Sequence, residues 1–156
     1  MQTGLVHLHN ILRWVILIFL LVSTVKAYTG WKGKKALTPG DKKVWLITLI
    51  AAHTTALLGF YQVALGRYGF ITTVPPEGAS FMKDRVLRFF WIEHPMGMLI
   101  AIILITMGYI KAKKQVSDEV KYKKAFTYFG IALVVILASI PWPFRELIGR
   151  PWFPGL

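Results

Sequence analysis

The sequence predicts an all-α integral membrane protein, a four-helix bundle with both termini outside the cell. Hydrophobic residues make up 55% of the 156 residues, the mean hydropathy is +0.53, and the apolar residues fall into four long runs. With its flanks, each run reaches the roughly 20 residues that a helix needs to cross a bilayer. A chain of this length is expected to form a single domain.

The four expected helices cover, in chain order, residues 5–28, 39–65, 81–113 and 118–140. Lysines follow the first apolar run instead of preceding it, which favours an anchored helix over a cleaved signal peptide. Thr38 followed by Pro39 is typical of a helix start, with a capping hydroxyl before a proline in the first turn. Ser80 and Ser117 are the expected caps of the third and fourth helices.

The lysines set the expected orientation. Twelve of the thirteen lysines lie in residues 26–43 and 111–124, beside the two loops that alternating spans place on one side of the membrane. Positively charged loops stay in the cytoplasm, so both termini and the loop 66–85 are expected outside. The net charge of +12 is therefore juxtamembrane, and it does not indicate nucleic acid binding.

Histidine is rare in membrane spans and is a candidate functional residue there. His9 and His94 each lie 17 residues from an inner lysine of the same helix, Lys26 and Lys111, which is about 25 Å along a helix. Two imidazoles at one level can bind the iron of a haem from opposite sides, so His9 and His94 are the expected metal ligands. The chain has no cysteine, which excludes iron–sulfur clusters and covalent haem attachment.

Two further histidines are less easily placed. His53 is expected about 15 Å above Lys43, near the middle of the membrane. It is either a lone polar residue bonded to a neighbouring threonine or carbonyl, or an axial ligand of a lower haem, or the partner of His94 if its helix is tilted. His7 is two residues from His9, so it points away from it and is expected to meet water.

All six arginines lie in the parts of the chain expected in the outer half of the membrane or outside it. Arginine pairs carboxylates through a bidentate fork, and haem carries two propionates. The expected propionate partners are Arg13, which is one turn from His9, together with Arg88 and Arg145. Anchoring to lipid headgroups is the alternative, and it is preferred for Arg67, Arg85 and Arg150.

The stretch FFWIEHPMGM, residues 89–98, places an acid, a histidine and a proline in an apolar setting. Pro95 cannot donate to the Trp91 carbonyl, so the helix is expected to bend near His94. The bend either aims the imidazole inward or is an ordinary proline bend of a membrane helix. Glu93 is expected to face another direction, toward another side chain or outer water. The small residues that follow favour close helix packing, although they would also admit a flat macrocycle.

The stretches HNILRW (9–14), AHTTALLGFYQ (52–62), RFFWIEHPMGMLIAIILITMG (88–108) and ASIPWPFR (138–145) carry a resemblance that covers nearly the whole chain. The sequence resembles small four-helix bacterial membrane proteins catalogued as cytochrome b-like. The resemblance implies non-covalent haem b and electron transfer in the bacterial inner (cytoplasmic) membrane. The chain departs from the cytochrome b561 pattern of histidine pairs, because residues 118–140 contain no histidine.

The leading hypothesis is therefore a multi-pass b-type haem protein that transfers electrons in the lipid bilayer, with quinone or a larger respiratory complex as candidate partner. A non-haem accessory or structural subunit of a larger membrane complex is the main alternative. A histidine-based metal or proton site in a transport protein is the third. Whether the protein is an enzyme stays open; the cytoplasmic loops are too short for a catalytic domain, so any activity would lie in the bundle.

The first testable prediction concerns orientation. Because the chain lacks cysteine, Gly33→Cys and Gln115→Cys each introduce a single thiol in a lysine-rich loop. Both thiols are expected to resist a membrane-impermeant reagent in intact cells and to react after the membrane is permeabilised. A single cysteine in the loop 66–85 serves as the accessible control. Ready labelling at positions 33 or 115 in intact cells would reverse the orientation.

Overall fold

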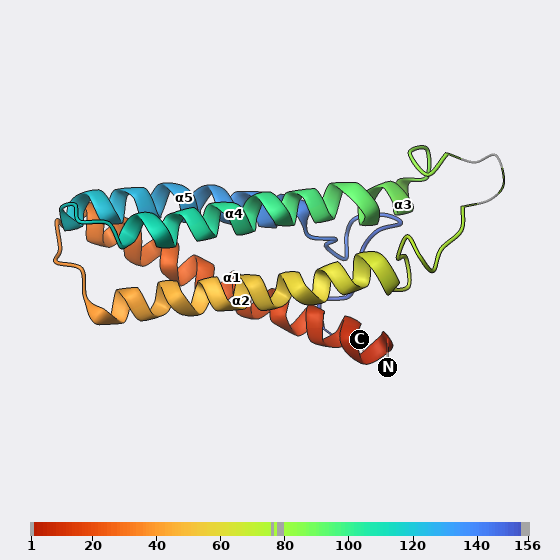
Figure 1. Cartoon of the computed structure of the whole chain (residues 1–156), viewed down its shortest axis with the longest axis horizontal. Helices are drawn as coiled ribbons and strands as arrows, with labels where there is room; N and C mark the ends of the chain where they lie inside the picture. The colour runs from red at the N-terminus through yellow and green to blue at the C-terminus, as the bar shows by residue number, and fades with distance from the viewer. Residues whose placement is uncertain (1, 76, 78–79, 154–156) are drawn as a thin grey trace.

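A computed structural model of the chain describes residues 2–75, 77 and 80–153, and it shows four long helices lying side by side (Figure 1). These are α1 (Gln2–Lys32), α2 (Pro39–Leu65), α4 (His94–Ala112) and α5 (Asp118–Ser139). A short helix α3 (Arg85–Arg88) and a π-helical turn η1 (Phe89–Glu93) lead directly into α4. The described residues contain helices and connections but no strand, as the sequence predicts.

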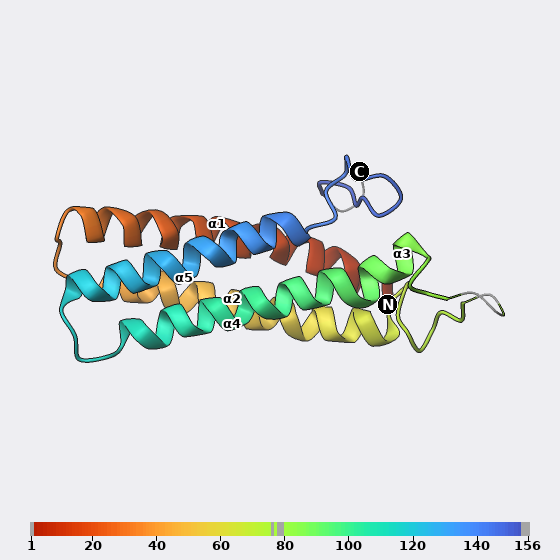
Figure 2. The ribbon, with the colours of Figure 1, turned by 90° about the horizontal axis from the view of Figure 1, so that it is seen from above.

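The four helical units are each long and apolar enough to cross a membrane, counting α3, η1 and α4 as one span. Their most apolar windows have mean hydropathies between 1.3 and 2.0. Large apolar side chains cover their outer faces, where lipid would contact them. The protein is a multi-pass membrane four-helix bundle. The two lysine-rich connections lie at one end of the bundle and both termini at the other (Figures 1 and 2).

The helices pack in the cyclic order α1, α2, α4, α5, so α1 and α4 lie diagonally across the bundle. Side chains such as Leu20, Ile105 and Phe129 fill the centre and are almost fully buried. Close contact between α4 and α5 depends on glycine: a Cβ atom on Gly108 would lie 2.7 Å from the Phe129 ring. The small residues of α4 thus serve helix packing at this position.

The helix boundaries agree with expectation in two places and differ in a third. Thr38 caps α2 through a reciprocal capping box with Asp41, and Pro39 opens the helix. Helix α5 begins after Ser117 as expected, but the Ser117 side chain makes no capping hydrogen bond. The third span begins at Arg85 and not at residue 81, because the Asp84 carboxylate, not Ser80, accepts bonds from the first free backbone amides.

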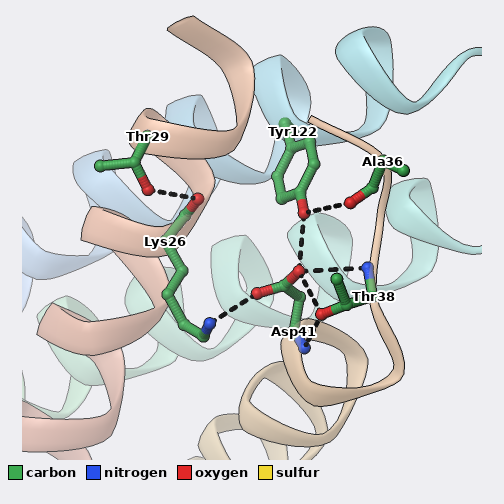
Figure 3. Close-up of polar contacts among 6 residues, drawn as sticks. All are labelled: Lys26, Thr29, Ala36, Thr38, Asp41 and Tyr122. Carbon is green, nitrogen blue, oxygen red and sulfur yellow. Dashed lines mark hydrogen bonds and ion pairs between the residues drawn. The ribbon is translucent and has the colours of Figure 1, made fainter. Parts of the chain in front are cut away.

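A buried polar network ties three elements together at the lysine-rich end (Figure 3). The Asp41 carboxylate lies 2.7 Å from the Lys26 ammonium on α1 and accepts a 2.6 Å hydrogen bond from the Tyr122 hydroxyl on α5. It also accepts from the Thr38 hydroxyl and backbone amide. One turn closer to the membrane centre on α1, the buried Ser23 hydroxyl bonds Thr48 of α2 at 2.7 Å.

The second testable prediction follows from this network. Asp41→Asn is expected to lower the free energy of unfolding by about 2 kcal/mol, because a buried carboxylate loses several charge-assisted hydrogen bonds. Glu93→Gln is the matched control: its ion pair with Arg88 has the same 2.7 Å separation, but its side chain is 44% exposed against 7% for Asp41. Thermal unfolding of the detergent-solubilised protein measures both. Equal losses would mean that burial does not set the strength of the Asp41 network.

Candidate functional site

A cavity of about 450 Å³ lies near the terminus-bearing end of the bundle, between α1, α2 and α4. Its walls are mainly apolar, with Met98 and Ile102 from α4, Ala56 and Gly59 from α2, and Ile136 from α5. Polar side chains gather on its α1 wall. Membrane bundles commonly build cofactor and ligand sites in such inter-helix spaces.

His9 and His94 meet across this cavity. The two histidines belong to the diagonal helices α1 and α4, and the centres of their rings are 6.4 Å apart with the ring planes inclined at 74°. Both line the cavity. The expectation from the sequence that the two side chains lie at the same depth is confirmed.

The orientation of His94 is fixed by α5. Its Nδ1 atom lies 2.8 Å from the backbone carbonyl oxygen of Ser139. A carbonyl oxygen only accepts hydrogen bonds, so Nδ1 carries the proton and Nε2 keeps a free lone pair. Histidines that bind metals are commonly held in this way, with the second ring nitrogen donating to a carbonyl.

The π-helical turn η1 accounts for the placement of His94 within its span. The His94 amide donates to the Phe89 carbonyl, five residues back, and Pro95 follows with no amide hydrogen to donate. A π-turn inserts one extra residue into a helix and rotates the residues on either side relative to each other. A π-turn therefore lies directly before His94 and Pro95, in the region where the sequence predicted a bend of the helix.

Three buried polar atoms on the cavity's α1 wall have no hydrogen-bond partner among the described residues. They are Nδ1 of His9, Oδ1 of Asn10 and Nε of Arg13. Native structures contain few such atoms, and each is a candidate contact for a ligand or water. Three of them within little more than one helical turn indicate a polar ligand group at this wall.

The arginines divide into two groups. Arg13 lines the cavity and is buried, and Arg67 and Arg150 line its outer part. Arg88 instead pairs with Glu93 and bonds the Met82 carbonyl. Arg145 bonds the carbonyls of Ala138 and Ile140, and its guanidinium lies 4.8 Å from the centre of the Phe89 ring. Of the three arginines expected at the site, only Arg13 is among the residues that line the cavity, whereas Arg67 and Arg150 had been assigned to lipid headgroups.

The remaining histidines differ in position. His7 is half-buried and also lines the cavity, and its expected contact with water stays a prediction. His53 is exposed on the outer face of α2, and its Nδ1 atom bonds the Leu49 carbonyl one turn back at 2.9 Å. His53 therefore does not share the cavity with His94. Gln62 does line the cavity, and it donates to the Leu5 carbonyl of α1.

The segment after α5 folds back over the outer end of the bundle (Figure 2). Arg13 donates to the backbone carbonyls of Pro151 and Trp152, and the Trp14 indole also donates to Trp152. Arg150 and Pro151 line the cavity mouth. Sequence patterns do not predict this cover, because its contacts join residues more than 130 positions apart and are accepted by backbone carbonyls.

No family model, no curated protein and no solved structure matches the chain. The fold and cavity by themselves define a class: a multi-pass membrane four-helix bundle with a histidine pair facing across an outer cavity. Within the described residues, no group of three or more His, Asp or Glu side chains is placed to hold a metal ion. Of the histidines that line the cavity, His9 and His94 are the two whose rings face each other.

The third testable prediction concerns the contact that orients His94. A Cβ atom on Gly97 would collide with the Ser139 side chain, whose own Cβ lies 2.9 Å away. Gly97→Ala is therefore expected to push α5 from α4 and to lower the free energy of unfolding by about 2 kcal/mol. Gly130→Ala is the control, since a Cβ atom there would lie 4.0 Å from Thr24 Cγ2, an ordinary van der Waals contact. Thermal unfolding in detergent compares the two, and a loss at Gly130 as large as that at Gly97 would contradict the packing argument.

Proposed function

We propose that the protein holds one haem b between His9 and His94 and transfers electrons within the membrane. The observation that carries this proposal is the pair of imidazoles facing each other from diagonal helices, with ring centres 6.4 Å apart. An imidazole nitrogen binds a metal at about 2 Å, so two imidazoles on opposite sides of one iron have ring centres roughly 6 Å apart. The observed separation suits that arrangement.

The donor set also favours haem over a bare metal ion. A protein site for a metal ion commonly supplies three or four ligands, whereas His9 and His94 face each other here and no group of three His, Asp or Glu side chains among the described residues is placed to hold an ion. Haem iron takes its four equatorial bonds from the porphyrin and needs only axial protein ligands. Two histidines without a third ligand are therefore sufficient for haem.

The cavity has a suitable size and lining. Its volume of about 450 Å³ lies within the range of roughly 300–1,000 Å³ found for ligand sites. Apolar walls suit the porphyrin face, and the arginines suit its propionates, since guanidinium groups bind carboxylates in a bidentate manner. In this proposal Arg13 remains a propionate partner and is joined by Arg67 and Arg150, while Arg88 and Arg145 are not among the lining residues.

The protein's own groups then have distinct roles. Ser139 holds the His94 imidazole through its backbone carbonyl and leaves Nε2 free to bind. The segment that contains Pro151 and Trp152 covers the outer mouth and restricts the access of water. Haem, when bound, supplies a one-electron iron couple, and the protein supplies ligands, orientation and electrostatic surroundings.

The electron partner in this proposal is a membrane-dissolved quinone or a larger respiratory complex in the bacterial inner membrane. Phe60 and Leu99 line the cavity and are also exposed on the outside of the bundle, so the cavity reaches the lipid-facing surface. A partner can therefore approach from the bilayer. The lysine-rich loops would face the cytoplasm.

The fourth testable prediction concerns the proposed ligands. His94→Ala is expected to abolish the low-spin bis-histidine absorption and electron paramagnetic resonance spectra. The reason is that it removes Nε2 of His94, whose lone pair is free to bind iron. His9→Ala is expected to do the same or to leave a high-spin, five-coordinate haem. Spectra of the purified variants, expressed with haem precursor, measure both.

His53→Ala is the control and is expected to retain the low-spin spectrum, since His53 lies on the outer face of α2. Circular dichroism checks that each variant remains helical. A lost spectrum in His53→Ala with an intact one in His9→Ala would move the ligand pair to His53 and His94. Wild-type protein that takes up no haem during expression or reconstitution would favour the non-haem accessory subunit.

A further inference from the structure

The outer face of α2 has a regular pattern of exposed side chains. Its members follow the alternating spacing of four and three residues that forms the seam between two packed helices. They are Leu46, Ile50, His53, Leu57 and Phe60. We call this set, together with the neighbouring exposed Thr54, the α2 seam.

The α2 seam differs from the other lipid-facing surfaces in the middle of the bundle because it is polar at its centre. His53 is the fifteenth of the 27 residues of α2, so it lies at half the helix length. Exposed side chains in the middle of the other long helices are apolar, such as Ile18, Ile103 and Val134. The exception is Thr127 of α5, whose hydroxyl donates to a carbonyl of its own helix. Ionisable groups within membranes almost always face protein or water and not lipid.

The two polar side chains at the centre of the seam are complementary. His53 donates from Nδ1 to the Leu49 carbonyl, so its Nε2 is left as an acceptor. The Thr54 hydroxyl, on the adjacent position, is exposed and makes no hydrogen bond to any described residue, so it is a free donor. Hydrocarbon would satisfy neither group.

We propose that the α2 seam binds a second copy of this protein in a parallel, two-fold symmetric dimer. A two-fold axis along the membrane normal places α2 of the two copies side by side, with the same residues at the same depth. Each contact between two different residues then occurs twice. His53 of one copy accepts a hydrogen bond from Thr54 of the other, and the reverse bond forms by symmetry. One surface that carries both the donor and the acceptor at the same depth is self-complementary, which favours a second copy over a different protein.

The polar centre of the seam is separate from the proposed haem site, because His53 and Thr54 do not line the cavity, although Phe60 at the end of the seam does. The polar pair supplies specificity, while Ile50 and Leu57 supply apolar contact on either side. The four–three spacing allows the helices to pack over about two heptads around the pair.

Single cysteines test the proposal directly, since the natural chain has none. Leu57→Cys in native membranes is expected to form a disulfide-linked dimer on mild oxidation. Val134→Cys is the matched control, because Val134 is 66% exposed against 71% for Leu57 but lies on α5. The dimer is expected at position 57 and not at position 134.

Adding Thr54→Val to Leu57→Cys is expected to reduce the linked dimer on the order of tenfold, since two symmetric bonds are lost and each contributes about threefold. Native mass spectrometry of wild-type protein in lipid nanodiscs should show two copies. Equal linkage at positions 57 and 134, a wild-type monomer, or linkage of position 57 to another protein would each overturn the dimer. The haem spectrum measured on the same samples tells failure of the dimer apart from failure of haem binding.

Discussion

Hydrocarbon offers no hydrogen bonds, so every polar group inside this bundle must find a partner in the protein. Most do so in a regular way. The threonines at positions 24, 55 and 106 donate to the carbonyl four residues back in their own helix. Ser23 and Thr48 bond each other between α1 and α2. Asp41 collects donors from α1, α5 and its own capping residue. The bonds of Ser23 with Thr48 and of Asp41 with Lys26 and Tyr122 join different helices, and they fix the relative positions of helices whose packing is otherwise apolar.

The same constraint draws attention to groups that remain without a partner. They gather in two places: the α1 wall of the cavity, with His9, Asn10 and Arg13, and the outer face of α2, with His53 and Thr54. A further unpartnered buried atom, the indole nitrogen of Trp45, lies apart from both places, in the core near the Asp41 network. At the first two places, binding a partner would satisfy these polar groups. The proposed partner is haem in the cavity of one copy and a second copy of the protein at the α2 seam.

The turn before His94 shows how one local feature serves the site. If Phe89–Glu93 were an ordinary α-helix, the residues before it and after it would be rotated differently about the helix axis. The π-turn and Pro95 flank His94 where it meets Ser139 of α5, and Phe90 of the π-turn lines the cavity. The ring of Phe89 lies 5.8 Å from that of His94 and also contacts Arg145. Helix geometry, aromatic packing and the orientation of the imidazole are therefore coupled.

The sequence by itself determined the class of protein, the four spans, the end of the bundle that carries the lysines, and the equal depth of His9 and His94. These depend on local quantities: apolar run length, capping residues and a rise of about 1.5 Å per residue. Only the tertiary structure decided which side of each helix faces inward. It placed His53 outside the bundle and His7 at the cavity mouth, and it brought Arg67 and Arg150 to the cavity while Arg88 paired with Glu93. Rotation about a helix axis is set by contacts with neighbouring helices and by the π-turn, and the carbonyls of Pro151 and Trp152 reach Arg13 only through the folded chain.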